Sequence, residues 1–127
     1  MEHTFYHNQI IYFNNILYND LFQLKILHRT KRYLDAHFCN TIDLKDLALL
    51  QGFSPYHLLR LFKLYYGTTP KQYQISKRIE VAKNRLKKGY TVSESCYDVG
   101  FQSVTTFSTL FKRKTGMTPR EFQKSNF

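Results

Sequence analysis

The sequence has 127 residues, which fits one compact domain or two very small ones. Eleven Phe and ten Tyr supply a core without Trp, because each buried aromatic side chain stabilises a fold by roughly 1.5–3 kcal/mol. The sequence has no signal-peptide pattern and no apolar run of about 18 residues, which argues against secreted and membrane-spanning proteins, so we expect a cytoplasmic protein.

The formal net charge of +10 is concentrated in one part of the chain. Residues 1–50 carry five Lys and Arg and five Asp and Glu, whereas residues 51–127 carry fourteen and four. A localised positive field with a pI near 9.7 indicates a polyanionic partner, although simple solubility explains the same charge.

Residues 1–22 are rich in Phe, Tyr, Ile and Asn and carry almost no charge. We interpret them as an N-terminal extension, and three roles remain open: a helix packed on the domain, a dimer contact, or the end of a sensor region. The first regular helix is predicted from about Leu21 to His37. Its inward positions recur at helical spacing: Ile26, Tyr33, Leu34 and Phe38.

A pair of short helices joined at Gly52 follows, over about residues 43–66. Asp43 is a good N-cap for a helix that ends near Leu50, and Ser54 followed by Pro55 is a usual helix start. The second helix of the pair is expected to bury four side chains: Leu58, Leu61, Phe62 and Tyr65.

Thr69 and Pro70 then introduce a longer helix, predicted over about residues 71–88. At 1.5 Å per residue it is about 25 Å long. It has an apolar stripe (Tyr73, Ile79, Ala82 and Leu86), and basic residues lie between these positions. Because no alternating strand pattern is found, the fold class is all-α.

The pair of short helices then recurs over about residues 92–115. Four positions recur 48 residues later and eight more recur 49 residues later, with Gln102 as the inserted residue in the turn. The first four are Leu44, Ala48, Gly52 and Phe53, which become Val92, Cys96, Gly100 and Phe101. The other eight begin with Ser54, Leu58, Leu61, Phe62 and Lys63, which become Ser103, Phe107, Leu110, Phe111 and Lys112, and continue with Gly67, Pro70 and Tyr73, which become Gly116, Pro119 and Phe122.

Each repeated unit has the features of a helix-turn-helix. A small residue lets the two helices pack closely, a Gly permits the left-handed backbone of the turn, and a Ser caps the second helix. A helical hairpin repeated only for packing would have a similar pattern. The duplication together with the basic surplus favours binding to double-stranded DNA, with the second helix of each unit in a major groove.

These residues resemble the DNA-binding domain of the AraC/XylS family of bacterial transcription regulators. The similarity covers about residues 24–127, and we place the domain at residues 23–127. In the second unit it rests on Gly100-Phe101, Ser103, Phe107, Phe111-Lys112, Gly116 and Thr118-Pro119; in the first unit it rests on Leu47-Ala48, Ser54, Leu58, Leu61-Phe62-Lys63 and Gly67, and in the linker helix on Arg78 and Ala82.

The resemblance implies about seven helices, with two helix-turn-helix subdomains joined by the long linker helix. It also implies a transcription regulator that is usually an activator and contacts RNA polymerase. Members of this family often carry a separate ligand-binding domain ahead of the DNA-binding domain. This chain has no room for one, so it either works without a small-molecule effector or is a fragment of a longer chain.

By resemblance, Tyr56, Leu59 and Arg60 fall where family members contact bases. Arg60 is the strongest candidate, because its planar guanidinium can bond both acceptors of a guanine edge; a surface ion pair is the alternative. In the second unit the outward positions offer only short hydroxyls, a small apolar side chain and a turn amide. Its base-contact candidates are Gln102, Val104, Thr105, Ser108 and Thr109.

The phosphate-contact candidates are hydroxyl and basic residues: Ser54, Lys63, Ser103, Lys112 and Arg113. Clusters at residues 83–88 and 112–114 are either phosphate contacts or solvated faces. Successive major-groove segments lie about 34 Å apart on one face of a duplex, so two units in one chain can do what a dimer does elsewhere. We therefore expect a monomer on DNA.

Two other classes of protein remain open: a protein-interaction module, and an architectural or RNA-binding protein that binds nucleic acid without sequence preference. An enzyme is not expected, because the sequence has no paired carboxylates, no nucleophile and base at fixed spacing and no Gly-rich phosphate loop. Neither catalytic residues nor a cofactor are therefore predicted. Cys39 and Cys96 are interpreted as small buried hydrophobes, and no metal site is expected from the five His.

Overall fold

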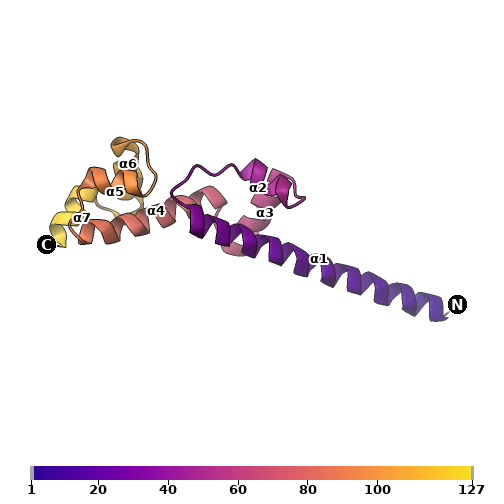
Figure 1. Ribbon diagram of the computed structural model, residues 1–127. Helices are drawn as coiled ribbons and strands as arrows, with labels where there is room; N and C mark the ends of the chain where they lie inside the picture. The colour runs from indigo at the N-terminus through magenta and orange to yellow at the C-terminus, as the bar shows by residue number, and fades with distance from the viewer. Residues whose placement is uncertain (1, 127) are drawn as a thin grey trace.

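The computed structural model describes residues 2–126, with side chains described for residues 8–11 and 20–126. Over this range the chain is all-helical, as predicted, and has seven helices (Figure 1). Within it no helix is long and apolar enough to cross a membrane. The helices are α1 (Glu2–His37), α2 (Leu44–Leu50), α3 (Pro55–Tyr66), α4 (Pro70–Lys87), α5 (Val92–Asp98), α6 (Val104–Thr115) and α7 (Pro119–Ser125).

The predicted start of the first helix at Leu21 is wrong, because α1 begins at Glu2 and runs without a break to His37. The sequence contains no Gly or Pro before Gly52, so nothing ends the helix between these points. Figure 1 shows α1 continuing well beyond the other helices, and Ile10 and Ile11 are exposed. Among the side chains of α1 that the structure describes, the buried ones are Ile26, Leu27, Thr30 and Leu34, all in its C-terminal part.

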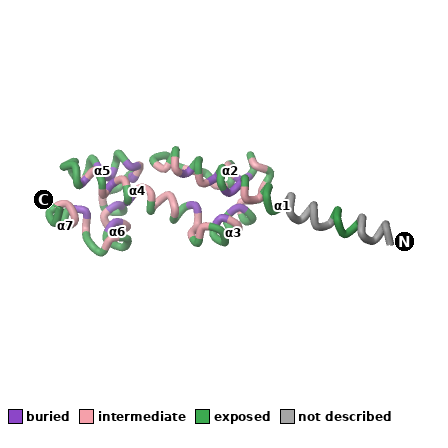
Figure 2. Tube along the Cα trace, turned by 90° about the horizontal axis from the view of Figure 1, so that it is seen from below, coloured by how far each residue is buried: buried purple, intermediate pink, exposed green. Residues whose placement is uncertain are grey.

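Two hydrophobic cores lie side by side along α4, one for each helix-turn-helix unit. Tyr73, near the start of α4, packs against the first core, and Ile79, Ala82 and Leu86 are buried in the second. The first core contains Ile26, Leu27, Leu34, Ala48, Leu58 and Phe62. The second also contains Cys96, Val99, Phe101, Phe107 and Phe111. The linker helix therefore belongs to both units, and Figure 2 shows purple buried segments in each of them.

Two of the predicted core residues are instead exposed. Tyr33 is 43% exposed and Tyr65 is 50% exposed. In each helix the buried stripe passes through the next position along the chain: Leu34 is buried in α1, and Tyr66 packs against the first core at the end of α3. Since one residue turns a helix by about 100°, an error of one position moves a side chain from the core to solvent.

The predicted helix starts at Asp43 and Ser54 are confirmed. The Asp43 carboxylate accepts a hydrogen bond from the Lys45 amide at 2.9 Å, and Ser54 Oγ accepts one from the His57 amide at 3.1 Å. Thr69 caps α4 with a reciprocal bond from its own amide to the Gln72 side chain, 3.2 Å long. These caps satisfy amides that have no partner within the helix, so they fix where each helix begins.

Tyr73 ties α4 to α1 by donating its phenol hydrogen to Asp35 Oδ1 at 2.5 Å. Burial raises the pKa of Tyr73 to about 12, and the bond to Asp35 adds to this rise. The protonated phenol of Tyr73 therefore contributes fully to the free energy of unfolding below about pH 10. This contribution is lost as the pH rises through about 12. We expect the free energy of unfolding of the wild type to fall faster across this window than that of Tyr73→Phe, measured by urea denaturation at each pH.

Tyr97→Phe is the control for this measurement, because Tyr97 is 56% exposed on α5. Its loss is expected to leave the wild-type pH dependence unchanged. Equal pH slopes for the wild type and Tyr73→Phe would contradict the prediction.

Candidate nucleic-acid interface

The two helix pairs, α2–α3 and α5–α6, have the same turn. Gly52 has φ 76° and Gly100 has φ 103°, in the left-handed region that favours glycine. After each glycine the next amide bonds back to the small residue of the first helix: Phe53 N to Ala48 O at 2.9 Å, and Phe101 N to Cys96 O at 3.1 Å. Both small residues are fully buried, and burial raises the pKa of the Cys96 thiol. The predicted repeat is therefore also a structural repeat.

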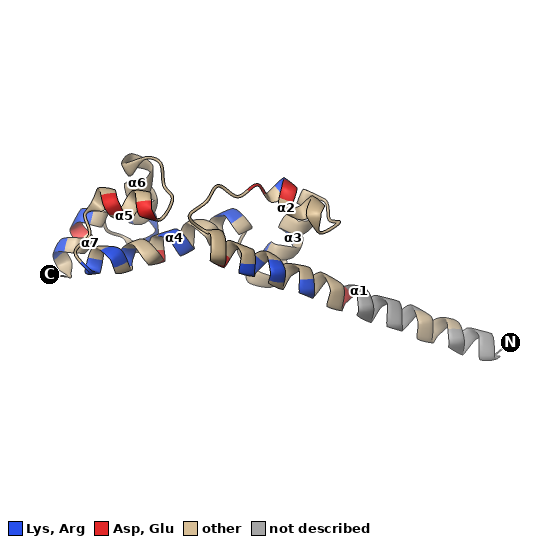
Figure 3. Cartoon of the chain, viewed as in Figure 1, with Lys and Arg blue, Asp and Glu red and all other residues tan. Residues whose placement is uncertain are grey.

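The second helices of the two units, α3 and α6, lie on the same side of α4 in Figure 2. Their charged residues are all basic: Arg60 and Lys63 in α3, and residues 112–114 in α6. The acidic residues of the two units lie instead on or just before the first helices, α2 and α5, as Figure 3 shows. This segregation leaves α3 and α6 with charged side chains that are all positive.

The side chains predicted to face outward from α3 are exposed. Tyr56 is 72% exposed and Leu59 36% exposed, and Arg60 and Lys63 are also exposed, whereas Phe62 on the opposite face is buried. Among the side chains that the structure describes, the ion pairs are Lys77–Asp35 and Arg85–Asp98, so Arg60 is not held in one. Its guanidinium group is available to a ligand.

The outward face of α6 is smaller than predicted. Gln102, Thr105, Thr109, Lys112 and Arg113 are exposed, but Ser108 is half-buried. Val104 is also half-buried and packs against the second core, so its assignment to the outward set is wrong in part. The first turn of α6 thus contacts the second core through the apolar side chain of Val104.

Three hydroxyl groups of the interface already have hydrogen-bond partners within the helices. Ser103 Oγ accepts a hydrogen bond from the Thr106 amide at 3.3 Å, as Ser54 Oγ does from the His57 amide. A serine that accepts at its cap still has its own hydrogen to donate to a phosphate. Thr109 Oγ1 instead donates to Thr105 O at 2.9 Å, which leaves mainly an acceptor facing outward.

A groove of about 810 Å³ opens between the two units. Leu59 of α3 and Gln102 of the second turn, both predicted base contacts, line it, and Leu34, Arg78 and Phe101 are among its other lining residues. The groove therefore has a predicted base-contact residue of each unit in its lining.

Two glutamines that the sequence analysis did not single out occupy equivalent places in the two units. Gln74 Nε2 donates to the carbonyls of Phe38 and Asn40 at 3.1 and 2.7 Å, at the end of α1. Gln123 Nε2 donates to the carbonyls of Leu86 and Tyr90 at 3.1 and 2.7 Å, at the end of α4. The glutamines are 49 residues apart, the offset of the repeat, so extending the repeat comparison would have found them.

Comparisons with known proteins agree with this geometry. A family model described as a helix-turn-helix domain matches residues 47–125, more than half of the chain. A curated relative from Pseudoalteromonas carrageenovora, an uncharacterised HTH-type transcriptional regulator in the cgkA 5'region, is 33% identical over 79% of this chain. The chain spans 60% of the length of that relative and less than half of the length of the next two, so it corresponds to a part of these proteins.

Two solved structures have the same fold over most of their length. A transcriptional regulator with an AraC-type DNA-binding domain, from Chromobacterium violaceum, has a TM-score of 0.72 at 27% identity and covers 81% of this chain and 93% of its own. The DNA-binding domain of AdpA, a global transcriptional factor solved in complex with a target DNA, has a TM-score of 0.72 at 25% identity and covers 78% and 90%. The chain belongs to the AraC-type helix-turn-helix family of DNA-binding transcription regulators.

Proposed function

We propose that this chain reads a specific double-stranded DNA sequence by placing α3 and α6 in two successive major-groove segments. The observation that carries the proposal is that α3 and α6, the second helices of the two units, lie on one side of α4 in Figure 2. Each has exposed side chains, and the charged residues of both are all basic. A rigid shared helix fixes their separation, so the DNA bends where its own geometry does not match. Both helices then act at once, as a dimer of single units would, and the chain binds as a monomer.

The two units contribute differently to this reading. In α3, Arg60 bonds the acceptor atoms of a guanine, Tyr56 contacts a phosphate or a thymine methyl group, and Leu59 offers apolar contact only. In α6, Thr105, Ser108, Thr109 and the turn residue Gln102 supply fewer and shorter polar groups, and Val104 turns partly inward. Base specificity therefore comes mainly from α3, and α6 anchors the backbone through Ser103, Lys112 and Arg113.

Arg60→Ala is expected to remove the preference for one base pair within the site. The selected duplex should bind about 5- to 150-fold more weakly, which corresponds to the loss of roughly 1–3 kcal/mol for a bidentate contact to guanine. Binding to random duplex should change far less. The measurement is selection from a random duplex library with the wild type, followed by binding titrations of both proteins on the selected and random duplexes.

Lys63→Ala is the matched control, since Lys63 lies one turn further along the same exposed face of α3. A residue that contacts only phosphate weakens binding to every sequence alike and lowers the log–log salt slope by about 1. If Arg60→Ala behaves like Lys63→Ala, Arg60 is a phosphate contact and not a base reader.

The second candidate function is an architectural or protein-interaction module with only non-specific DNA binding, and the weak polar set on α6 favours it. The same selection experiment separates the two functions. An enriched motif of two blocks about one helical turn apart supports the specific reader. Binding without any enriched motif, which weakens steeply as salt increases, supports the module.

We also propose that the chain acts as a non-enzymatic activator in the bacterial cytoplasm and contacts RNA polymerase. Membership of a family of transcription regulators supports this proposal. Transcription in vitro from a promoter carrying the selected site, with and without the protein, tests both the sign of regulation and the need for polymerase contact.

A further inference from the structure

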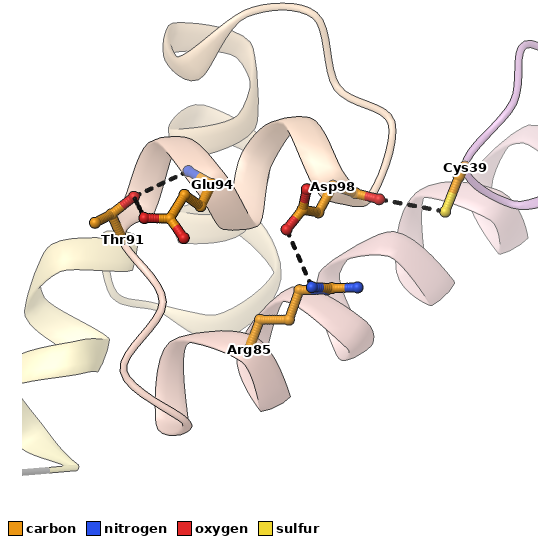
Figure 4. Close-up of polar contacts among 5 residues, drawn as sticks. All are labelled: Cys39, Arg85, Thr91, Glu94 and Asp98. Carbon is orange, nitrogen blue, oxygen red and sulfur yellow. Dashed lines mark hydrogen bonds and ion pairs between the residues drawn. The ribbon is translucent and has the colours of Figure 1, made fainter.

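The two units meet where the end of α1 approaches the second turn. Gly100 lies so close to the backbone of Cys39 that a Cβ added there would be 2.7 Å from the Cys39 carbonyl carbon. Cys39 itself is exposed, contrary to its prediction as a buried hydrophobe, because it lies in the link after α1. Its Sγ donates to the Asp98 carbonyl at 3.5 Å, and Figure 4 shows this contact beside the ion pair of Asp98 with Arg85.

Arg78, near the middle of α4, lies at the centre of this junction. Its Nε donates to the Phe38 carbonyl at 2.6 Å and its terminal nitrogen donates to the Asn40 carbonyl at 3.1 Å. Its guanidinium carbon lies 5.2 Å from the centre of the Phe101 ring, directly after the second turn. Burial lowers the pKa of Arg78, as expected for a cation held between two packed segments. One side chain thus joins the link between α1 and α2 to the second turn.

Comparison with the glutamines separates this role from ordinary helix capping. Gln74 bonds the same two carbonyls as Arg78, and Gln123 makes the equivalent pair of bonds inside the second unit. These bonds cap the helix that precedes each unit. Arg78 has no counterpart at the repeat offset, where the sequence has Phe127. The arginine therefore serves the junction between the units, which occurs once.

We propose that Arg78 is a positioning residue that sets the angle and separation of α3 and α6, and with them the distance between the two DNA blocks that the protein accepts. This inference rests on the proposed two-block DNA reading. The planar guanidinium of Arg78 is bonded to the carbonyls of the link after α1 and lies over the Phe101 ring. It therefore resists rotation of one unit against the other. Shifting one block by a base pair turns and translates it along the duplex, so only a rigid junction can discriminate such a shift.

The test uses the full chain and a series of duplexes in which the two selected blocks are moved one base pair closer together or further apart. The wild type should prefer one spacing. Arg78→Ala should reduce this preference by about tenfold, as expected when charge-assisted hydrogen bonds are lost, and should bind a duplex with a single block as the wild type does. Arg78→Lys, which keeps the charge without the fork, should be intermediate and gives the same comparison if Arg78→Ala does not fold.

Gln123→Ala is the matched control, because it removes two equivalent bonds but leaves the junction intact. It should lower stability and keep the wild-type spacing profile. Both Arg78 variants with the wild-type profile would overturn the inference.

A second readout does not need DNA. Residual dipolar couplings of backbone amides should fit one alignment tensor for both units in the wild type and Gln123→Ala, and two tensors in Arg78→Ala. A wild type without any preferred two-block site would overturn the proposed function, whereas one tensor in Arg78→Ala would overturn the positioning role. The two failures are therefore distinguishable.

Discussion

Gly100→Ala is expected to destabilise the protein by about 2–5 kcal/mol, well beyond the effect of the same change at Gly52. Both glycines have positive φ, where an alanine costs roughly 1–2 kcal/mol. Only at Gly100 does the added Cβ meet backbone, with the Cys39 carbonyl carbon at 2.7 Å and its Cα at 2.9 Å. Because backbone cannot swing aside as a flexible side chain does, we add about 1–3 kcal/mol for overpacking.

Gly52→Ala is the matched control, since an added Cβ there meets nothing within 4 Å. Urea denaturation of the two variants and the wild type gives the difference directly. The excess at Gly100 measures the contact with the Cys39 backbone together with the greater backbone strain of an alanine at φ 103° than at φ 76°. Equal losses would show that the link after α1 moves away at little cost and that the junction is loose.

Phe62→Ala is expected to cost about 3–5 kcal/mol and to loosen the first unit selectively. Phe62 is fully buried, and its ring lies 4.7 Å from the Tyr66 ring and 6.0 Å from the Tyr73 ring, all within the first core. Since the second core is built from other side chains, its helices can keep their packing. Hydrogen exchange should therefore speed up much more at the amides of α2 and α3 than at those of α5 and α6.

The reciprocal variant, Phe111→Ala, is the control for that pattern. Phe111 is fully buried in the second core, 5.6 Å from the Phe107 ring and 5.4 Å from the Phe122 ring. It should expose α5 and α6 and leave α2 and α3 protected. Uniform loss of protection across all four helices in either variant would mean that the two cores unfold as one.

Local signals predicted the two helix-turn-helix units well. The caps at Asp43 and Ser54 and the turn glycines act within a few residues, and the repeat offset is found by comparing the sequence with itself, so the sequence alone places them. The errors at Tyr33 and Tyr65 have a different origin. Each lies next to another large apolar residue, and periodicity cannot choose between two such neighbours without knowing what each packs against.

Contacts between distant segments could not be predicted in this way. Arg78 matched the family pattern, but its partners Phe38 and Asn40 lie 40 and 38 residues earlier, and nothing in the spacing indicates that they meet. The length of α1 was also missed. The sequence there contains no Gly or Pro that would mark a boundary, so only the continuous backbone shows where the helix begins.

The outward positions Tyr56, Leu59, Arg60 and Lys63 of α3 were predicted correctly because its two buried residues, Leu58 and Phe62, are one turn apart and define the opposite face. The same reasoning was less accurate in α6, where Val104 precedes the first buried residue and still reaches the core. Which of these side chains contact DNA stays a prediction.

The shared helix α4 limits how this protein can be dissected. Its Tyr73 packs against the first core, and its Ile79, Ala82 and Leu86 are buried in the second. Cleaving the chain at any single position within α4 therefore does not give two fragments that each keep a complete core. Two overlapping fragments, residues 20–88 and 69–126, would each need their own copy of α4. The same sharing makes the architecture extensible, as in solenoids: each further unit would add one helix pair and one closing helix, about 49 residues at the repeat offset seen here.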